Sequence, residues 1–453
     1  MKLFGKTISI SLLVLLVVAS TLTFRMFNKH IWSTPEKVIA WDVISYYAYL
    51  PATFIEHDLT LSFTDHEHVG TYWPETLPDG RKVIKTTMGM SIMYSPFFLA
   101  MHIAAPALGN EANGFTVPYA FALTLAGLFY TILGLFLLRK VLLRHFPEWI
   151  TSIVLVILIF GTNLYWYSLY EPPMSHAFSF CLFALFALLT ELWHEKPSVW
   201  RSVAVGLTIG IISLVRPSNI LVGVYFALYG VRSKETINNK CRIFKDSWCK
   251  IVLMAMAAVL VWIPQMVYWF VNTGQLFFYS YGDNERFFFG NPKIVEGLFG
   301  FRKGWLVYTP VMSFALMGLL PLYRHHRNLF WAISVFFVLN VYVVFSWWCW
   351  WYGGSRGMRA MIECQALMVI PLAAWIEWLA GCKPVLRSIM VVILSAITML
   401  SAFHNLRYIH GSIHWDSMTR AAYFDGFFRT TPSKRFSSLL KNPDYDSARQ
   451  GNR

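Results

Sequence analysis

The feature that most constrains this chain is a series of long apolar segments that recurs over most of its length. From residue 115 onward, apolar runs of roughly 15–24 residues follow one another, which is about the length a helix needs to cross hydrocarbon. A shorter run at 8–18 follows Lys2 and Lys6. The pattern predicts an all-α polytopic membrane protein with about eleven transmembrane helices. The later runs are residues 115–138, 149–169, 175–193, 202–215, 217–231, 251–271, 306–323, 329–347, 361–380 and 386–404.

The composition supports a membrane protein and argues against a nucleic-acid-binding one. Hydrophobic residues make up 56% of the chain and charged residues only 14%, whereas soluble domains carry about 25% charged residues. The net charge is +14, but the lysines and arginines punctuate the apolar runs. We therefore interpret the excess as topology control, with some contact to anionic membrane lipid or phosphate. The six cysteines show neither metal-ligand spacing nor a disulfide framework.

The basic residues between the runs predict the orientation of the chain. They gather in alternate connections, at 139–144, 196–201, 232–250, 324–327 and 383–387, whereas the connection at 170–175 has none. By the positive-inside rule these connections face the cytoplasm. The N-terminus would then be cytoplasmic, and the first run an uncleaved span rather than the alternative, a cleaved signal peptide. The C-terminus would be external, in a multi-pass protein of the inner (cytoplasmic) membrane.

The same pattern divides the chain into two parts. Residues 1–404 form the transmembrane domain, whose first outer loop, 25–114, is amphipathic and partly helical. Residues 405–453 form a short external tail. We expect residues 440–453 to be disordered because they are polar.

The first outer loop carries a lone carboxylate among aromatic residues. With helical spacing Asp42, Tyr46 and Tyr49 share one face, which would present an acid at the membrane edge. The alternative is an interfacial helix whose tyrosines merely lie at headgroup level. The loop also contains His66 and His68 beside acidic residues, but histidines in a polar loop are usually solvated, and we predict no metal site.

Several other outward segments carry charged groups that a simple loop does not need. Basic residues on the outer side oppose the usual charge bias, so they require a reason. One reason is salt bridges and lipid headgroups; the other, which we favour for the set, is an outward cavity that binds an anionic phosphate. The charged residues and the histidine in question are Glu171, His176, Arg216, Asp283, Glu285, Arg286, Arg302, Lys303, Arg356 and Arg359.

In their order along the chain and their predicted position on the outer side of the membrane, these residues resemble those of the GT-C superfamily of membrane glycosyltransferases. The closest similarity is to bacterial proteins related to the protein mannosyltransferases and to the enzyme that adds aminoarabinose to lipid A. The motifs that carry the resemblance are Trp41-Asp42 with Tyr46-Tyr47-Ala48-Tyr49-Leu50-Pro51, Lys85 with Met88-Gly89, Leu214-Val215-Arg216-Pro217, residues 298–310, and residues 347–359. Asp42 is followed by Val43 instead of the family's second acid, so a divalent cation is not assumed and no cofactor is expected.

The resemblance implies an inverting transfer of a sugar from a polyprenyl-phosphate donor to an acceptor hydroxyl on an envelope glycan, lipid or protein. Asp42 would be the general base. The donor phosphate would be held by Lys85, Arg216, Arg302, Lys303, Arg356 and Arg359. Tyr46, Glu171, His176 and Glu285 would orient the substrates.

Two other function classes stay open. A transporter or flippase of a lipid-linked saccharide would also have many spans and a cationic cavity, but it should show repeated halves, and the sequence has none. A scaffold for an envelope complex would not need cations gathered at the outer mouths of the spans.

Overall fold

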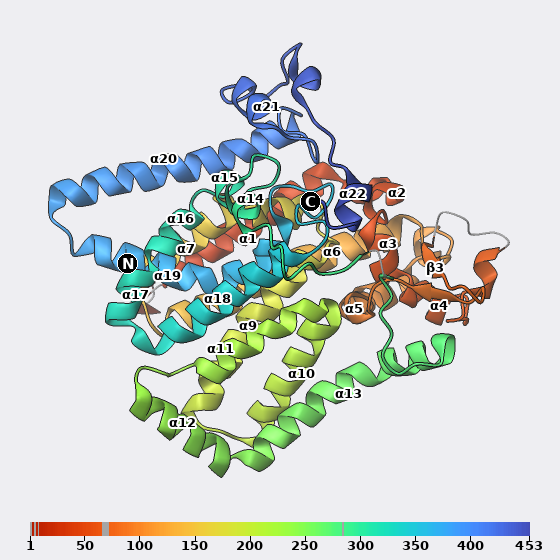
Figure 1. The fold of residues 1–453 in the computed structure, drawn as a ribbon, viewed down its shortest axis with the longest axis horizontal. Coiled ribbons are helices and arrows are strands. Elements are labelled where there is room, and N and C mark those ends of the chain that lie inside the picture. The colour runs from red at the N-terminus through yellow and green to blue at the C-terminus, as the bar shows by residue number, and fades with distance from the viewer. Residues whose placement is uncertain (1, 4–5, 8, 66–71, 283–284) are drawn as a thin grey trace.

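The chain is mainly helical, with few strands, in a computed structural model that describes residues 2–3, 6–7, 9–65, 72–282 and 285–453 (Figure 1). About 69% of the residues are helical, which fits the predicted all-α fold. Within these residues, seven helices are long and apolar enough to cross a membrane. They are α1 with the turn after it (Ile10–Ser33), α6 (Val117–Leu142), α9 (Ser175–Glu195), α13 (Trp248–Thr273), α18 (Arg327–Ser346), α19 with the turn before it (Arg359–Ala380) and α20 (Pro384–Ile409).

The remaining apolar runs contain shorter or interrupted helices. Glycine and proline explain the interruptions: Gly161 separates two helices, and Pro217 ends the helix before it because the residue preceding a proline avoids the α conformation. The sequence pattern therefore predicted where helices lie, but not which of them are continuous. The segments are α7 (Glu148–Phe160) with α8 (Leu164–Leu169), α10 (Val199–Val215), η4 (Pro217–Val222) with α11 (Gly223–Leu228), and α15 (Trp305–Tyr308) with α16 (Met312–Met317) and α17 (Leu319–His325).

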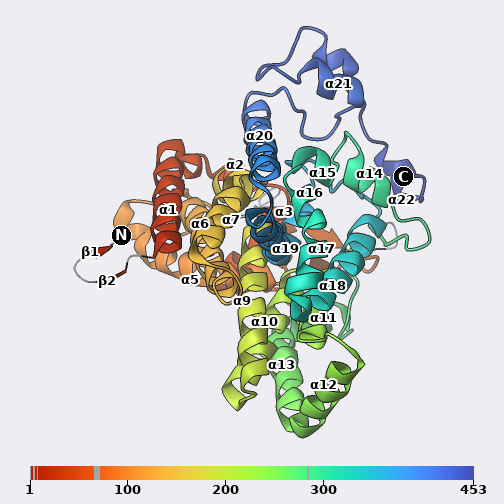
Figure 2. The ribbon, with the colours of Figure 1, turned by 90° about the vertical axis from the view of Figure 1, so that its left-hand side faces the viewer.

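The basic connections meet at one end of the helix bundle. Arg144 Nε lies 2.6 Å from Glu191 Oε2, and Lys240 Nζ lies 2.8 Å from His194 Nε2. The N-terminus, with the short strands β1 (Lys2–Leu3) and β2 (Lys6–Thr7), and the amphipathic helix α12 (Lys234–Asp246) lie toward this end (Figures 1 and 2). The helices of the segment 25–114 and α22 lie toward the other end (Figure 1).

The first outer loop is partly helical and also contains a β-hairpin, which the sequence analysis did not predict. Strands β3 (Pro74–Thr76) and β4 (Lys82–Ile84) pair antiparallel around a turn in which Gly80 has a φ of 85°. His66 and His68 lie outside the described residues. The helices of the loop are α2 (Pro35–Val38), α3 (Asp42–Tyr47), α4 (Tyr49–Phe54) and α5 (Gly89–Ala104).

The C-terminal tail folds back onto the outer end of the bundle instead of being disordered as expected. It contains α21 (Arg420–Asp425) and α22 (Tyr445–Arg449). The Tyr445 hydroxyl donates to Asp416 Oδ2 at 2.9 Å, and its ring lies 5.4 Å from that of Trp351. Ala448 is fully buried. A few anchoring side chains thus fix a stretch whose overall composition is polar.

Helices α10 and α13 touch at two glycines. A Cβ at Gly206 would lie 2.2 Å from the carbonyl oxygen of Met254, and one at Gly210 would lie 2.9 Å from that of Ala258. The two backbones therefore pack directly against each other at these positions, as small residues permit in membrane helices.

Candidate functional site

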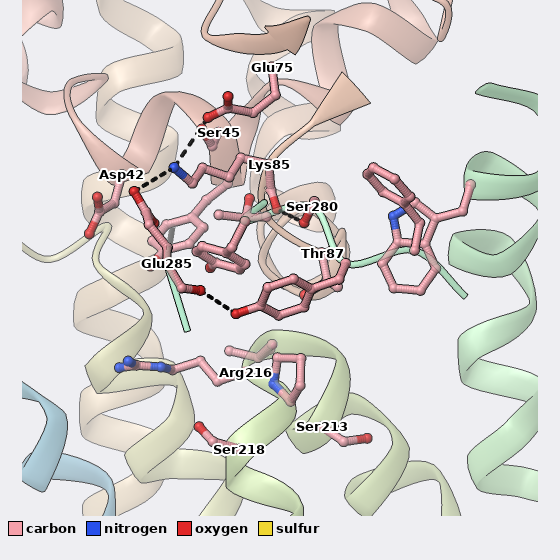
Figure 3. Close-up of a pocket in the computed structure, with 18 of the residues that line it drawn as sticks. Asp42, Ser45, Glu75, Lys85, Thr87, Ser213, Arg216, Ser218, Ser280 and Glu285 are labelled. Atoms are coloured by element: carbon pink, nitrogen blue, oxygen red, sulfur yellow. Dashed lines mark hydrogen bonds and ion pairs between the residues drawn. The ribbon is translucent and has the colours of Figure 1, made fainter. Parts of the chain in front are cut away.

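A large cavity lies at the end of the bundle that carries α3 and the β3–β4 hairpin, and Figure 3 shows some of the residues that line it. Its volume is about 1460 Å³, and its walls come from α3, the β3–β4 hairpin, α10, α13, and the segments 277–281, 285–287 and 347–353. Sites for drug-sized ligands usually span about 300–1,000 Å³, so this cavity could accept a larger molecule. It has a charged end and an apolar arm.

Asp42 occupies the charged end and is paired with an arginine. It is the first residue of α3, and its carboxylate is 45% exposed. Asp42 Oδ2 lies 3.0 Å from Arg359 Nη2, which comes from the 3-10 turn (Arg359–Met361) at the start of α19. The preceding residue, Trp41, has a φ of 52°, which is uncommon for a bulky side chain. The arginine gives this carboxylate one orientation while leaving it accessible.

Arg216 enters the cavity from the reversal between α10 and η4. Its guanidinium Nη1 donates to Glu363 Oε1 at 3.1 Å, and the guanidinium lies 5.8 Å from the ring centre of Tyr352. Because Pro217 follows it, the residue adopts an extended conformation that ends the helix at this position.

A third cation, Lys85, lies between the hairpin and α5. Its Nζ is 3.2 Å from Glu75 Oε1 and also 3.2 Å from Glu285 Oε1 (Figure 3). The side chain is 26% exposed. Ion pairs at this exposure exchange readily, so an anionic ligand could displace either carboxylate.

The aromatic wall beside these charges includes Tyr46. Burial raises the pKa of its hydroxyl, with the Asp42 carboxylate acting in the same direction. The hydroxyl therefore stays protonated at neutral pH and can donate a hydrogen bond to a ligand.

The apolar arm of the cavity runs between α10 and α13. Val259 and Ile220, which line it, are each 57% exposed, so the arm opens sideways on the outer surface of the bundle. In a membrane that surface would face lipid. The residues of the arm are Ile209, Ile220, Ala258, Val259, Trp262, Met266, Trp269, Phe277 and Phe278.

Only part of the predicted set lines this cavity. Arg302, Lys303 and Arg356 do not, and their assignment to a phosphate is corrected here because they lie outside the lining and each donates to an acceptor of the protein, although Arg356 Nη1 is buried without a hydrogen-bond partner. Lys303 Nζ donates to the carbonyls of Ser355 and Trp415. The predicted residues that do line the cavity are Asp42, Tyr46, Lys85, Arg216, Glu285 and Arg359.

The other two cations are fixed in the same way. Arg302 Nη1 donates to the Asp416 carbonyl at 3.0 Å, and Arg356 Nε donates to Asn405 Oδ1 at 3.2 Å. Burial lowers the pKa of Lys303 to about 7 and that of Arg356 to about 10. These residues tie the segment 352–361 to the tail.

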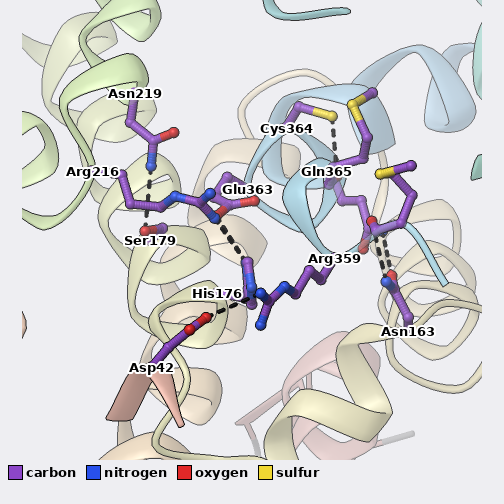
Figure 4. Close-up of polar contacts among 12 residues, drawn as sticks. Asp42, Asn163, His176, Ser179, Arg216, Asn219, Arg359, Glu363, Cys364 and Gln365 are labelled. Atoms are coloured by element: carbon purple, nitrogen blue, oxygen red, sulfur yellow. Dashed lines mark hydrogen bonds and ion pairs between the residues drawn. The ribbon is translucent and has the colours of Figure 1, made fainter. Parts of the chain in front are cut away.

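Glu171 and His176 also lie outside the cavity lining. Burial raises the pKa of the Glu171 carboxyl. His176 is buried, and its Nδ1 lies 3.0 Å from Glu363 Oε1 (Figure 4). His176 therefore belongs to the layer behind Arg216, where it cannot touch a ligand in the cavity directly.

Glu363 is the contributor that sequence reasoning missed. It is 2% exposed and contacts both Arg216 and His176. A signal was available, because an acid inside a predicted span is costly and marks a functional or pairing role.

In the described part of the chain, no group of three or more His, Cys, Asp or Glu side chains could hold a metal ion. Comparison with models of known protein families found no match to this chain, and a search of curated proteins found no significant match either.

Proposed function

We propose that the chain is an inverting GT-C-type glycosyltransferase. It would move a sugar from a polyprenyl-phosphate donor to an acceptor hydroxyl at the outer face of the cytoplasmic membrane. One observation carries the proposal: a single cavity joins the accessible Asp42 carboxylate and four cations to an apolar arm that opens sideways between α10 and α13. The cations are Lys82, Lys85, Arg216 and Arg359. An amphiphile with an anionic head and a long apolar tail matches this shape.

The path of the chain supports an orientation with eleven crossings. Seven long helices, together with four shorter or interrupted segments (α7–α8, α10, η4–α11 and α15–α17), would give eleven crossings if α5 stays in the first outer loop. An odd number puts the two termini on opposite sides. With the basic end in the cytoplasm, the N-terminus is cytoplasmic, and the cavity and the tail are external.

Binding of the donor follows from the two parts of the cavity. The polyprenyl tail lies in the apolar arm, and the phosphate lies against Arg216 and Lys85. Arginine offers parallel N–H groups to a phosphate, and the lysine adds a point charge. Before the donor arrives, Glu75 and Glu285 neutralise Lys85; afterwards Glu285 and Tyr46 are placed to contact the sugar.

The transfer is a single displacement at the anomeric carbon. The acceptor hydroxyl attacks this carbon, a new C–O bond forms, and the bond to the phosphate oxygen breaks. Asp42 takes the hydroxyl proton as general base while Arg359 holds its carboxylate in place. Arg216 and Lys85 stabilise the charge that gathers on the leaving polyprenyl phosphate.

Replacement of Asp42 by asparagine tests this proposal. Asp42→Asn keeps the shape of the side chain but removes the base, so sugar transfer should fall by roughly 10²–10⁴-fold. The assay uses purified protein in detergent, a labelled polyprenyl-phosphate sugar and an extract of candidate acceptors. Donor binding should survive, because the cations and the apolar arm remain. Glu36→Gln, at an exposed position in α2 of the same loop, is the matched control.

Two results would contradict the proposal. Transfer by Asp42→Asn at the parental rate would remove Asp42 from the chemistry. Absence of any transfer product, together with movement of the intact lipid-linked sugar across vesicles that contain the parent protein, would indicate a transporter instead.

A further inference from the structure

A cluster of buried charges lies directly behind the cavity wall (Figure 4). Glu363, in the first turn of α19, is 2% exposed and lies within the candidate span Arg359–Ala380. Its Oε1 accepts from Arg216 Nη1 at 3.1 Å and lies 3.0 Å from His176 Nδ1. Its Oε2 is buried and makes no hydrogen bond. Of these three residues, only Arg216 reaches the cavity.

A buried carboxylate at this depth needs an explanation, because a charge inside the membrane region is costly unless it is paired. Because only one oxygen of the Glu363 carboxylate is hydrogen-bonded, this position is not the one that would stabilise the carboxylate most. The bonded oxygen contacts one nitrogen of the Arg216 guanidinium, on the side away from the cavity. This geometry leaves the other N–H groups of Arg216 free to meet a ligand.

The start of α19 also contacts the proposed base, Asp42. Arg359 lies in the 3-10 turn that precedes α19, and Glu363 lies in the first turn of α19. Arg359 pairs with Asp42, and Glu363 pairs with Arg216. Two ion pairs of opposite polarity therefore join the beginning of α19 to the two sides of the cavity.

We propose that Glu363 is a positioning residue that fixes the guanidinium of Arg216 for the phosphate of a polyprenyl-phosphate ligand. The proposal rests on the proposed function, because it assumes that Arg216 meets a phosphate. An arginine side chain has many rotamers, and restricting them beforehand favours binding. Glu363 also repels a phosphate, but the open mouth of the cavity screens that repulsion, so we expect the positioning effect to dominate.

A double-mutant cycle tests the proposal. The probe is polyprenyl phosphate without a sugar, and its Kd is measured by tryptophan fluorescence, since Trp262, Trp269, Trp347 and Trp348 line the cavity. We expect Glu363→Gln to raise the Kd about tenfold, the lower end of the effect of removing a residue that orients a ligand-binding group. If Glu363 acts through Arg216, the double variant Arg216→Gln/Glu363→Gln should bind no more weakly than Arg216→Gln alone.

Additive effects of the two substitutions, or an unchanged or lower Kd in Glu363→Gln, would overturn the proposal. Glu377→Gln is the matched control, because Glu377 lies near the other end of α19 and pairs with His326, 2.7 Å away. Its Kd should equal that of the parent.

Two further comparisons keep the test decisive. If Glu363→Gln fails to accumulate in the membrane, Glu363→Asp replaces it. This variant keeps the charge but moves the carboxylate away from Arg216, so the Kd should rise severalfold. An unchanged Kd would overturn the proposal. Failure of the proposed function has a different signature: the parent protein itself would not bind polyprenyl phosphate, or Arg216→Gln would bind it as well as the parent does.

Discussion

Two sets of outward cations look alike in the sequence and differ completely in the structure. Lys85, Arg216 and Arg359 line the cavity and pair with carboxylates. Arg302 and Lys303 lie outside it and donate to backbone carbonyls. A carboxylate can exchange its cation for another ligand at modest cost, whereas a buried carbonyl that loses its donor is left unsatisfied. The hydrogen-bond partner of a cation, more than its charge, therefore indicates whether the residue can bind a ligand or has a structural role.

The largest expected effect contrasts the two lysines. Lys303→Met removes the two hydrogen bonds that Nζ donates to the carbonyls of Ser355 and Trp415. Each carbonyl keeps one other donor, the Tyr408 hydroxyl or the Ser355 N–H, so the free energy of unfolding should fall by about 2–3 kcal/mol. Lys85→Met removes partly exposed ion pairs and should change it by less than about 1 kcal/mol, while weakening polyprenyl-phosphate binding. Unfolding in detergent and the Kd are measured for both variants. Equal loss of stability in both would abolish the distinction.

The second prediction contrasts two arginines. Arg216→Ala removes a charge-assisted contact worth about 1.5–3 kcal/mol and should raise the Kd for polyprenyl phosphate roughly 10–150-fold. Arg302→Ala should leave the Kd of the folded protein unchanged, because the Arg302 guanidinium lies outside the cavity and donates to the carbonyl of Asp416. A similar loss of affinity in the two variants would mean that the outer cations act together.

The third prediction concerns pH and again separates the two sets. Burial lowers the pKa of Lys303 from 10.5 to about 7. Between those values the unfolded chain binds more protons than the folded one, so the contribution of Lys303 to stability rises with pH from about 7 to about 10.5 and is constant below that window. The slope should be at most about 1.4 kcal/mol per pH unit. Unfolding at pH 7, 8 and 9 should show a steeper rise in the parent than in Lys303→Met; parallel curves would contradict the assignment.

The smallest effect is expected at the border between the two sets. Tyr445 lines the cavity, yet its hydroxyl donates to Asp416, whose carbonyl accepts from Arg302. Tyr445→Phe should lower the free energy of unfolding by about 1 kcal/mol and change the Kd by less than about twofold. A large change in Kd would show that the tail forms part of the binding surface.

Sequence periodicity predicted the helical parts of this fold well and the irregular parts poorly. Every long apolar run contains helix, because hydrocarbon-length patterning is a strong signal. The breaks at Gly161 and Pro217 depend on local backbone preferences. The β3–β4 hairpin is short and polar, and the fold of residues 440–453 depends on a few contacts such as that between Tyr445 and Trp351.

For the candidate site, residue type and the predicted side of the membrane picked out Asp42, Lys85, Arg216 and Arg359, which line one cavity. They could not separate these from Lys303, because the carbonyls of Ser355 and Trp415 that hold it carry no signal in the sequence. Tertiary contacts also determine which carboxylate forms an ion pair with which cationic side chain.

The close contact at Gly206 bears on which half of a bilayer could supply the cavity. This glycine holds α10 against α13 toward the basic connections, before Ile209, the first residue of α10 that lines the arm. The second contact, at Gly210, lies beside the arm, because its neighbour Ala258 lines it. Under the proposed function, a lipid would enter the arm from the leaflet on the cavity side. A donor that receives its sugar in the opposite leaflet would have to be flipped across the bilayer first, so its supply and its use would be separate events.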